Sequence, residues 1–421
     1  MRLADIALGL GWGLMAFFGA LTAVEAWRYF RAALFPAPES ATPRTSRADW
    51  PRAAGMLAAG WALSRLLMLL TLAVCQWVTA HGFATFANNL AWFARRWDAK
   101  HYLALIESGY QAEGDTRLLI VFLPLYPAVC RAVCTTTGLS ARASALLVSN
   151  ACLLGCGAAL YALLSPEDAR LARRAVLLFL FCPVTFFYSL PYSESLFLLL
   201  TLLSTLCARR RRWIAAVAFG ALAANARILG MAVAVPVFWE MLRDARRTPK
   251  RPMAADIGLC ALRVLPISLG LMAYLLLNAR VFGNPFQFLI FQREQWNQSA
   301  GTLAWSFQVS FVNLLTYEKA LYRLGVWGPQ VLLMPAIPAL ILWRRRAESP
   351  ADAAYALVYH YVSFMPTWLL SGARYASAMY PLYPMLARIP RTRRQFALML
   401  GCECALLIYM TVIGVWHGHV M

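Results

Sequence analysis

Residues 143–164 of this chain read ASALLVSNACLLGCGAALYALL, a run of 22 residues that contains no charged side chain. A helix needs about 20 apolar residues to cross a hydrocarbon core of roughly 30 Å. Apolar runs of about 16–25 residues recur along the whole sequence. The quoted stretch is therefore expected to be one of several membrane-spanning helices.

The overall composition excludes a soluble protein. Of the 421 residues, 61% are hydrophobic and only 14% are charged, whereas a soluble chain of this length needs a largely polar exterior. The net charge of +20 could suggest a nucleic-acid partner, but the arginines form short clusters between apolar runs rather than a basic face interleaved with aromatics. This distribution is typical of membrane proteins that follow the positive-inside rule.

The arginine clusters predict the topology when all of them are placed in the cytoplasm. They lie at residues 28–52, 170–174, 209–212, 243–251, 344–346 and 388–394. With this constraint the chain has about twelve spans, within a range of 11–13, and both termini lie outside. We expect a single integral membrane domain over residues 1–421. It comprises an extra N-terminal span and basic linker at 1–52 and a core at 53–421.

The individual spans follow from the apolar runs. The first, at 4–24, lacks a small-x-small cleavage site and is expected to remain as an uncleaved span. The proline- and serine-rich linker after it is expected to be irregular. The other predicted spans lie at residues 53–79, 143–164, 175–190, 196–208, 253–278, 324–343, 352–370, 376–386 and 396–415, with external stretches at 81–117 and 280–323.

Two segments need special treatment. Residues 213–242 are flanked by cytoplasmic arginines at both ends, which predicts a helical hairpin that turns near Asn225-Ala226-Arg227. Residues 118–134 are apolar enough to span, but a span there would move cluster 170–174 to the outside. Two prolines and Arg131 favour a bent helix that lies at the outer surface or enters the membrane partway.

No metal site is expected. The ten cysteines lie mostly inside apolar runs and form no CxxC pair. His81, His360, His417 and His419 show no ligand spacing.

Polar residues converge on the predicted non-cytoplasmic side. Charged groups at a membrane edge are costly, so their convergence on one side indicates a site. These residues are Asp98, Glu107, Tyr110, Ser193, Glu194, Arg227, Gln292, Arg293, Arg374 and Tyr375.

Asp98 is the candidate for proton transfer. The first external loop is expected to be helical from Trp97 to Glu107, which places Asp98 on the same face as Tyr102 and half a turn out of phase with Glu107. A transfer to a hydroxyl group needs a carboxylate that accepts the proton of the attacking hydroxyl. A helix-capping or ion-paired aspartate beside Arg95 and Arg96 explains the same residue without catalysis.

Arg227 and Arg374 are candidates for binding a phosphate, because guanidinium groups neutralise phosphate charge without a metal. Each could instead be an arginine that snorkels at a helix end. Glu194 could cap the following span or accept a hydrogen bond from a sugar hydroxyl. The aromatic and amide residues of FLIFQREQWNQ (288–298) suit either sugar binding or an interfacial belt.

Six motifs occur in a characteristic order along residues 97–388. They are WDAKHYLALIESGY (97–110), FLPLYP (122–127), YSLPYSESLFLLL (188–200), ANARILG (224–230), FQREQW (291–296) and SGARYASAMYPLYPMLAR (371–388). This ordered set resembles bacterial members of the PIG-V-like family of the GT-C glycosyltransferases. The second mannosyltransferase of glycosylphosphatidylinositol anchor synthesis belongs to that family.

The resemblance implies an all-α GT-C-like helix bundle whose external first loop carries short helices. It also implies an inverting transferase that uses a polyprenyl-phosphate sugar, usually mannose, without a cofactor. Asp98 matches the position of the catalytic base, whereas Ile106-Glu107 departs from the Ile-Ala pair often found in the family. Substrate binding is then assigned to Trp97, Tyr102, Glu107, Tyr110, Tyr126, Ser193, Glu194, Arg227, Gln292, Arg293, Arg374 and Tyr375.

The expected partners are the lipid-linked donor, a glycolipid or glycan acceptor and membrane lipids. The arginine- and alanine-rich composition suggests a bacterial cytoplasmic membrane, with the site facing outward.

Two other classes of function remain open. A transporter or flippase of lipid-linked glycans needs charges along a path through the membrane, and no internal repeat of the kind many transporters carry is evident. A non-catalytic subunit would show no activity as a purified single chain.

Overall fold

The structure is a computed structural model that describes residues 3–36, 49–80, 86–344 and 347–417. Of the described residues, 81% are helical, and none of them forms a β-strand. Six described helical segments are long and apolar enough to cross a bilayer, so the chain is an all-α polytopic membrane protein. They are α1 (Leu3–Leu34), α2 (Trp50–Ala80), α6 (Ala141–Leu164), α11–η4–α12 (Met253–Phe282), α15–η5–α16 (Ala320–Arg344) and α20 (Arg393–His417).

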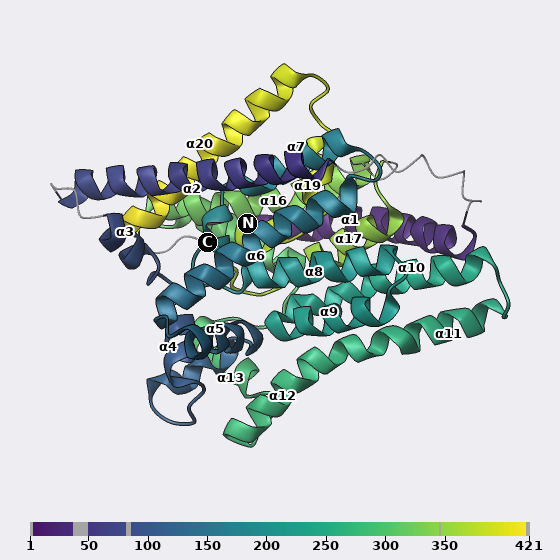
Figure 1. Cartoon of the computed structure of the whole chain (residues 1–421), viewed down its shortest axis with the longest axis horizontal. Helices are drawn as coiled ribbons and strands as arrows, with labels where there is room; N and C mark the ends of the chain where they lie inside the picture. The colour runs from purple at the N-terminus through teal and green to yellow at the C-terminus, as the bar shows by residue number, and fades with distance from the viewer. Residues whose placement is uncertain (1–2, 37–48, 81–85, 345–346, 418–421) are drawn as a thin grey trace.

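The other described helices are shorter and connect or pack between these six (Figure 1). On the amino-terminal half they are α3 (Phe86–Phe93), α4 (Ala99–Ser108), η1 (Asp115–Val121), α5 (Leu125–Thr137), α7 (Ala169–Leu180), η2 (Thr185–Tyr188) and α8 (Glu194–Arg209). The remaining ones are α9 (Trp213–Ala226), η3 (Ile228–Val233), α10 (Ala234–Arg247), α13 (Gln287–Trp296), α14 (Leu303–Thr316), α17 (Pro350–Phe364), α18 (Gly372–Ser377) and α19 (Leu382–Ala387).

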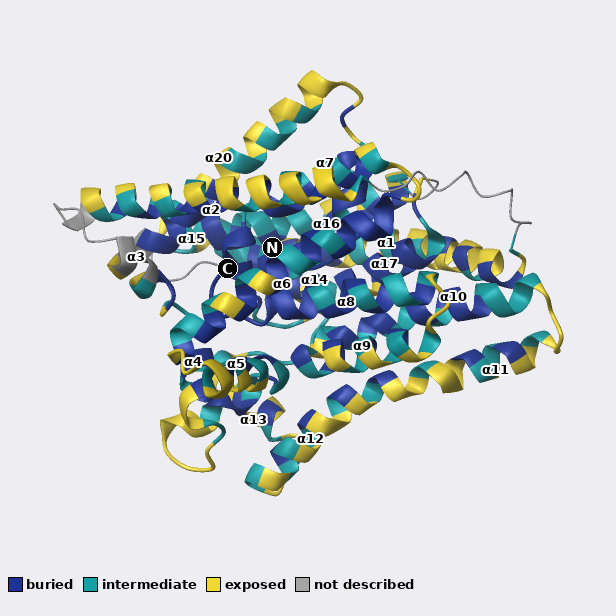
Figure 2. Ribbon diagram, in the orientation of Figure 1, coloured by how far each residue is buried: buried dark blue, intermediate teal, exposed yellow. Residues whose placement is uncertain are grey.

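Six long spans are fewer than the 11–13 predicted. Hydropathy does not distinguish side chains that face lipid from side chains that face other helices, and α8 is buried on nearly every side (Figure 2). The predicted span at 175–190 stops at Leu180, because Pro183 disfavours helix in the residue before it. The predicted span at 376–386 is divided into α18 and α19 around Pro381.

Both segments that needed special treatment are broken as predicted. The pair η1 and α5 is bent by 114° where the preferred interpretation of residues 118–134 placed a bent helix. Helix α9 ends at Ala226, and Arg227 adopts an extended conformation with φ −153° and ψ 143°. Helix α10 then returns alongside α9, so the chain forms the expected hairpin.

Helix α8 lies at the centre of the bundle, between α6 and α9. Lipid-facing positions are recognisable on the outer helices, where large apolar side chains such as Leu70, Leu276 and Leu398 are exposed (Figure 2). The close approach of α12 to α9 depends on Gly270, where a Cβ atom would meet the carbonyl oxygen of Ala221 at 1.9 Å.

The stretch at 280–323 is more structured than the predicted external loop. It contains α13 and the apolar helix α14, and α14 packs along α1. At their contact a Cβ on Gly11 would lie 2.7 Å from the Ala304 carbonyl oxygen. The extra N-terminal helix is therefore integrated into the bundle through α14.

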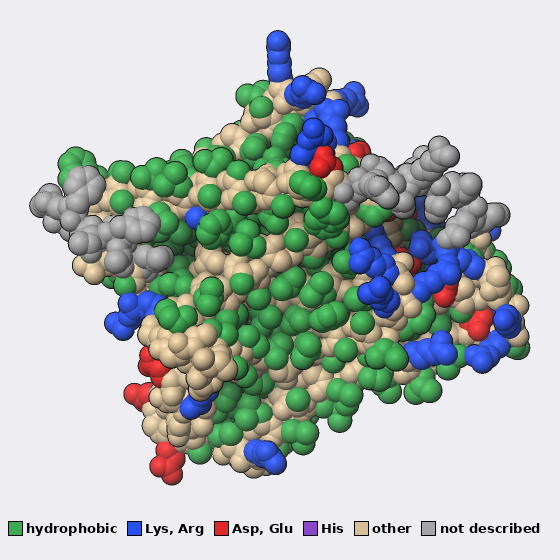
Figure 3. All heavy atoms as spheres, viewed as in Figure 1, with side chains coloured by type: hydrophobic (Ala, Val, Ile, Leu, Met, Phe, Trp, Pro, Cys, Tyr) green, Lys and Arg blue, Asp and Glu red, His purple; other side chains and the backbone are tan. Residues whose placement is uncertain are grey.

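Most of the described Lys and Arg side chains gather at the top and right of the view in Figure 3, and apolar side chains cover much of the surface between them and the left end. Helices α8 and α10 both end among these basic side chains, at Arg209 and Arg247. Arg209 forms an ion pair with Asp352 of α17, which also accepts a hydrogen bond from Tyr380. Most of the predicted linker (residues 37–48), His81 and His419 lie outside the described residues.

Candidate functional site

A large cavity opens at the end of the bundle opposite the arginine clusters. Its volume is about 610 Å³, and its walls come from α4, the start of α8, η3, α13 and the segment between α17 and α18. Segments separated by more than 270 positions in the sequence meet there, because Asp98 and Arg374 both line it. A volume in this range suits a small-molecule or headgroup-sized ligand.

A strained turn positions Asp98. Trp97 has φ 48°, in the left-handed region that residues with a Cβ rarely adopt. The turn is fixed by packing of Trp97 against Phe93 and by a 3.3 Å hydrogen bond from Tyr192 to the carbonyl oxygen of Arg96. Asp98 follows at the N-cap of α4, but its side chain makes no capping hydrogen bond. Its carboxylate is therefore directed to the cavity instead of to the helix end.

Glu194 enters the site at the first turn of α8. Backbone N–H groups at the start of a helix favour a nearby negative charge. The Glu194 side chain is only 1% exposed, and its Oε2 atom has no hydrogen-bond partner among the described residues. Burying an unpaired carboxylate is unfavourable, so Glu194 depends on the cations beside it.

Arg227 reaches the site because the chain reverses between α9 and α10. The turn needs Gly230, since a Cβ there would lie 2.2 Å from the carbonyl carbon of Ala223 on α9. Arg227 Nη1 lies 2.6 Å from Glu194 Oε1 and donates a 3.3 Å hydrogen bond to Ser193 Oγ. Its guanidinium also lies 5.0 Å from the ring centre of Tyr375.

Arg374 sits on the short helix α18 within a cage of aromatic rings. Its guanidinium carbon lies 5.2–5.4 Å from the ring centres of Phe187, Tyr192 and Tyr375, a geometry in which ring faces attract a cation. Ser377 Oγ donates a 2.6 Å hydrogen bond to the Arg374 carbonyl oxygen.

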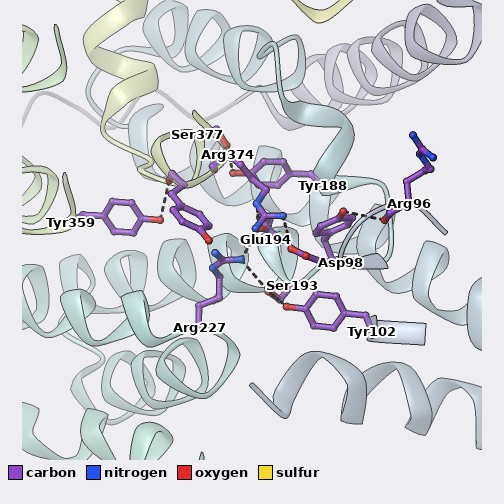
Figure 4. Close-up of polar contacts among 12 residues, drawn as sticks. Arg96, Asp98, Tyr102, Tyr188, Ser193, Glu194, Arg227, Tyr359, Arg374 and Ser377 are labelled. Carbon is purple, nitrogen blue, oxygen red and sulfur yellow. Dashed lines mark hydrogen bonds and ion pairs between the residues drawn. The ribbon is translucent and has the colours of Figure 1, made fainter. Parts of the chain in front are cut away.

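The charged side chains form one connected network (Figure 4). Arg374 Nη1 donates a 2.9 Å hydrogen bond to Asp98 Oδ2, and Arg374 Nε lies 3.1 Å from Glu194 Oε1. Arg227 pairs with the same Glu194 oxygen. Two carboxylates and two guanidinium groups thus alternate in the order Asp98, Arg374, Glu194, Arg227.

The network keeps Arg374 charged and the neighbouring Tyr102 protonated. Burial disfavours the charge of Arg374, but Glu194 and Asp98 more than offset it and raise the pKa of Arg374 well above its usual value. Burial, together with the charge of Glu194, raises the pKa of Tyr102. Tyr102 therefore remains a phenol and donates a 2.9 Å hydrogen bond to Ser193 Oγ.

The structure brings together nine of the thirteen residues assigned to the site from the sequence. These cavity-lining residues are Asp98, Tyr102, Ser193, Glu194, Arg227, Gln292, Arg293, Arg374 and Tyr375.

The other four assigned residues do not line the cavity. Glu107 is exposed on α4, because nine residues of helix carry it half a turn away from Asp98. Trp97 packs against Phe93 and Phe187, and Tyr110 donates a 2.8 Å hydrogen bond to the Phe122 carbonyl oxygen. Tyr126 is buried behind Tyr102 and pairs with Ser149.

Sequence reasoning missed several cavity-lining residues. Tyr192 lies within the PYSES motif next to Ser193 and Glu194, both of which were assigned to the site, so this motif could have indicated Tyr192 as well. Trp296 is the last residue of α13, and Gln298 and Ser299 follow that helix. Trp296 and Gln298 lie in the stretch 288–298 that was considered for sugar binding, but neither was assigned individually. The isolated bridge between Ala300 and Pro366 brings this segment to the loop after α17, and no sequence pattern indicates that pairing.

Two comparisons with known proteins extend this description. A family model described as Mannosyltransferase (PIG-V) matches residues 68–292, which is more than half of the chain and includes Asp98, Glu194 and Arg227. Arg374 lies beyond the matched residues. A search of curated proteins finds no significant match.

Within the described ranges, no three His, Cys, Asp or Glu side chains are grouped in a way that could hold a metal ion.

Proposed function

The chain belongs to the mannosyltransferase (PIG-V) family, and we propose that it transfers mannose from a polyprenyl-phosphate donor to a lipid-linked or surface glycan acceptor. The family assignment supports a membrane-embedded mannosyl glycosyltransferase. We propose, beyond this family assignment, the polyprenyl-phosphate donor, the roles of individual residues and the non-cytoplasmic position of the site.

One observation supports the proposal above all others. A carboxylate that is 30% exposed, Asp98, and two arginines that are 7% and 15% exposed, Arg374 and Arg227, share one cavity. A glycosyl transfer from a lipid phosphate needs a proton acceptor beside the attacking hydroxyl and positive charge beside the departing phosphate. Both requirements are met within a single network of ion pairs.

The cavity also has room for an apolar chain. Its wall beyond the charged network includes Val121, Leu123, Ile228, Leu229 and Leu289. An isoprenoid would lie along this wall while its phosphate contacts the arginines. The mixture of an apolar wall and a few convergent polar groups is typical of ligand sites.

In the proposed reaction Asp98 accepts the proton of the acceptor hydroxyl as the oxygen attacks the anomeric carbon. The bond from that carbon to the phosphate oxygen breaks on the opposite side, which inverts the anomeric configuration. Arg227 and Arg374 stabilise the charge that develops on the phosphate.

Helix geometry supports a site on the non-cytoplasmic side. From Glu194 at the cavity, α8 runs 16 residues to Arg209, a length of about 24 Å. Arg210 and Arg211 follow directly, and α10 carries Arg246 and Arg247 in its last turn. Since basic clusters remain in the cytoplasm, a cavity at the opposite end would face outward.

The proposal is tested with the purified full-length chain, a panel of polyprenyl-phosphate sugars and candidate glycolipid acceptors. We expect transfer from the mannose donor, and Asp98→Asn should reduce the rate by about 10²–10⁴-fold, the usual contribution of a general base. Glu113→Gln, an exposed carboxylate in the loop after α4, is the control for a lost negative charge. Unchanged transfer by Asp98→Asn would exclude Asp98 as the base, and uptake of the lipid without transfer would favour a flippase.

A further inference from the structure

The guanidinium of Arg374 contacts two carboxylates through two different edges. Its Nε lies 3.1 Å from Glu194 Oε1 in an ion pair without a hydrogen bond, and its Nη1 donates a 2.9 Å hydrogen bond to Asp98 Oδ2 (Figure 4). The two carboxylates differ in burial, since Glu194 is 1% exposed and Asp98 is 30% exposed. One edge of Arg374 is therefore held in the protein interior, and the other is held by the accessible carboxylate.

The charges of the network cancel while the cavity holds no anion. Asp98 and Glu194 contribute two negative charges, and Arg227 and Arg374 contribute two positive charges. A phosphate gains strong binding only if it accepts hydrogen bonds from guanidinium N–H groups. Asp98 already accepts one N–H of the Nη1 group of Arg374, so a phosphate has to compete with Asp98 for that N–H.

The chemistry of transfer removes this competition, on the premise of the function proposed above. The acceptor O–H bond breaks and its proton passes to Asp98, while the acceptor oxygen forms a bond to the anomeric carbon. The bond from that carbon to the phosphate oxygen breaks, and its electron pair remains on the phosphate. Asp98 loses one negative charge in the same step in which the phosphate gains one.

We propose that Arg374 exchanges partners in this step, so that its Nη1 group passes from Asp98 to the departing phosphate while its Nε group stays on Glu194. The exchange needs only a small movement, because Glu194 keeps the guanidinium in place. The new hydrogen bond forms only as the phosphate becomes more negative. Interactions that are stronger in the transition state than in the ground state accelerate a reaction.

Arg227 has a different position in the network. Its Nη1 group contacts Glu194 and Ser193, and Glu194 keeps its charge throughout the reaction. Arg227 is therefore expected to keep its partners in the network while it stabilises the charge that develops on the phosphate. The partner exchange is a property of Arg374 alone.

Asp98→Asn reproduces the uncharged state of Asp98 and gives a direct test. The Kd of farnesyl phosphate is measured with the purified full-length chain in detergent, with farnesol as the uncharged control ligand. We expect Asp98→Asn to bind farnesyl phosphate more tightly than wild type, on the order of tenfold, the usual value of a hydrogen bond to a charged group. Farnesol should bind Asp98→Asn and wild type equally, and Glu113→Gln should bind farnesyl phosphate as wild type does.

A double-mutant cycle separates the release of Arg374 from simple loss of repulsion. The gain from Asp98→Asn should disappear in an Arg374→Gln background and persist in Arg227→Gln. If Arg374→Gln does not fold, Arg374→Lys replaces it. A lysine ammonium that stays paired with Glu194 lacks the second N–H edge that a guanidinium uses to contact Asp98 or the phosphate.

Equal or weaker binding by Asp98→Asn would overturn the exchange, as would a gain that persists without Arg374. The transfer assay on the same preparations tests the proposed function separately. Tighter binding with transfer intact would remove Asp98 as the base but leave its competition with phosphate for Arg374. Weaker binding of farnesyl phosphate by Asp98→Asn, with transfer abolished, would keep Asp98 as the base but exclude its competition with phosphate for Arg374.

Discussion

Replacing Glu194 with glutamine should destabilise the bundle from within the site. The carboxylate lies 2.6 Å from Arg227 Nη1 and 3.1 Å from Arg374 Nε, and its side chain is 1% exposed. Glutamine has nearly the same shape and keeps one oxygen. The substitution therefore removes the charge and leaves two largely buried guanidinium groups with Asp98 as their remaining counterion in the network.

The magnitude follows from these distances. At an effective dielectric constant of about 20, unit charges at 2.6–3.1 Å attract by roughly 5–6 kcal/mol per pair, most of which offsets the cost of burying the groups. Removing one partner of a buried pair lowers the free energy of unfolding by about 3–5 kcal/mol. Because Asp98 still neutralises Arg374, we expect about 3 kcal/mol for Glu194→Gln.

The assay is thermal unfolding of the purified chain in detergent, with and without farnesyl phosphate. A loss of about 3 kcal/mol corresponds to a decrease in Tm on the order of 5 °C. The phosphate should restore more stability to the variant than to wild type, because it supplies the missing negative charge.

Asp49→Asn is the matched control. It removes the carboxylate of an exposed pair with Arg52, at 3.0 Å, and exposed pairs contribute less than about 1 kcal/mol. If Glu194→Gln melts like wild type, or if the phosphate stabilises both proteins equally, the electrostatic explanation of the site is wrong.

Three further predictions concern the residues around the network. Gly230→Ala should lower the free energy of unfolding by about 2–3 kcal/mol and reduce transfer, since its Cβ would overlap α9; Gly258→Ala, which has open space around it, should not. Tyr102→Phe should cost about 1–2 kcal/mol in a thermal melt, because buried Ser193 loses one of its two donors. Burial lowers the pKa of His101 from its ordinary value of 6.5. The unfolded chain therefore binds protons more readily below pH 6.5, and Tm should fall there in wild type but less in His101→Gln.

The sequence predicted the elements of this fold where the physical cause was local. Uninterrupted apolar runs predicted the long helices, and arginines at both ends of residues 213–242 predicted a hairpin that turns at Arg227. Two prolines and Arg131 favoured a bent segment at 118–134, where η1 and α5 meet at 114°. Six described segments are long and apolar enough to span alone, against the 11–13 spans predicted, because shorter and largely buried helices such as α8 fall below that length.

The sequence by itself determined that this chain is an all-α membrane protein and which residues could accept a proton or bind a phosphate. Residue chemistry and the length of apolar runs are local properties. Only the tertiary structure decided that Asp98 pairs with Arg374, that Glu194 joins both arginines and that Glu107 lies outside the cavity. Those pairings depend on the relative placement of α4, α8, α9 and α18, which is determined by packing between residues far apart in the chain.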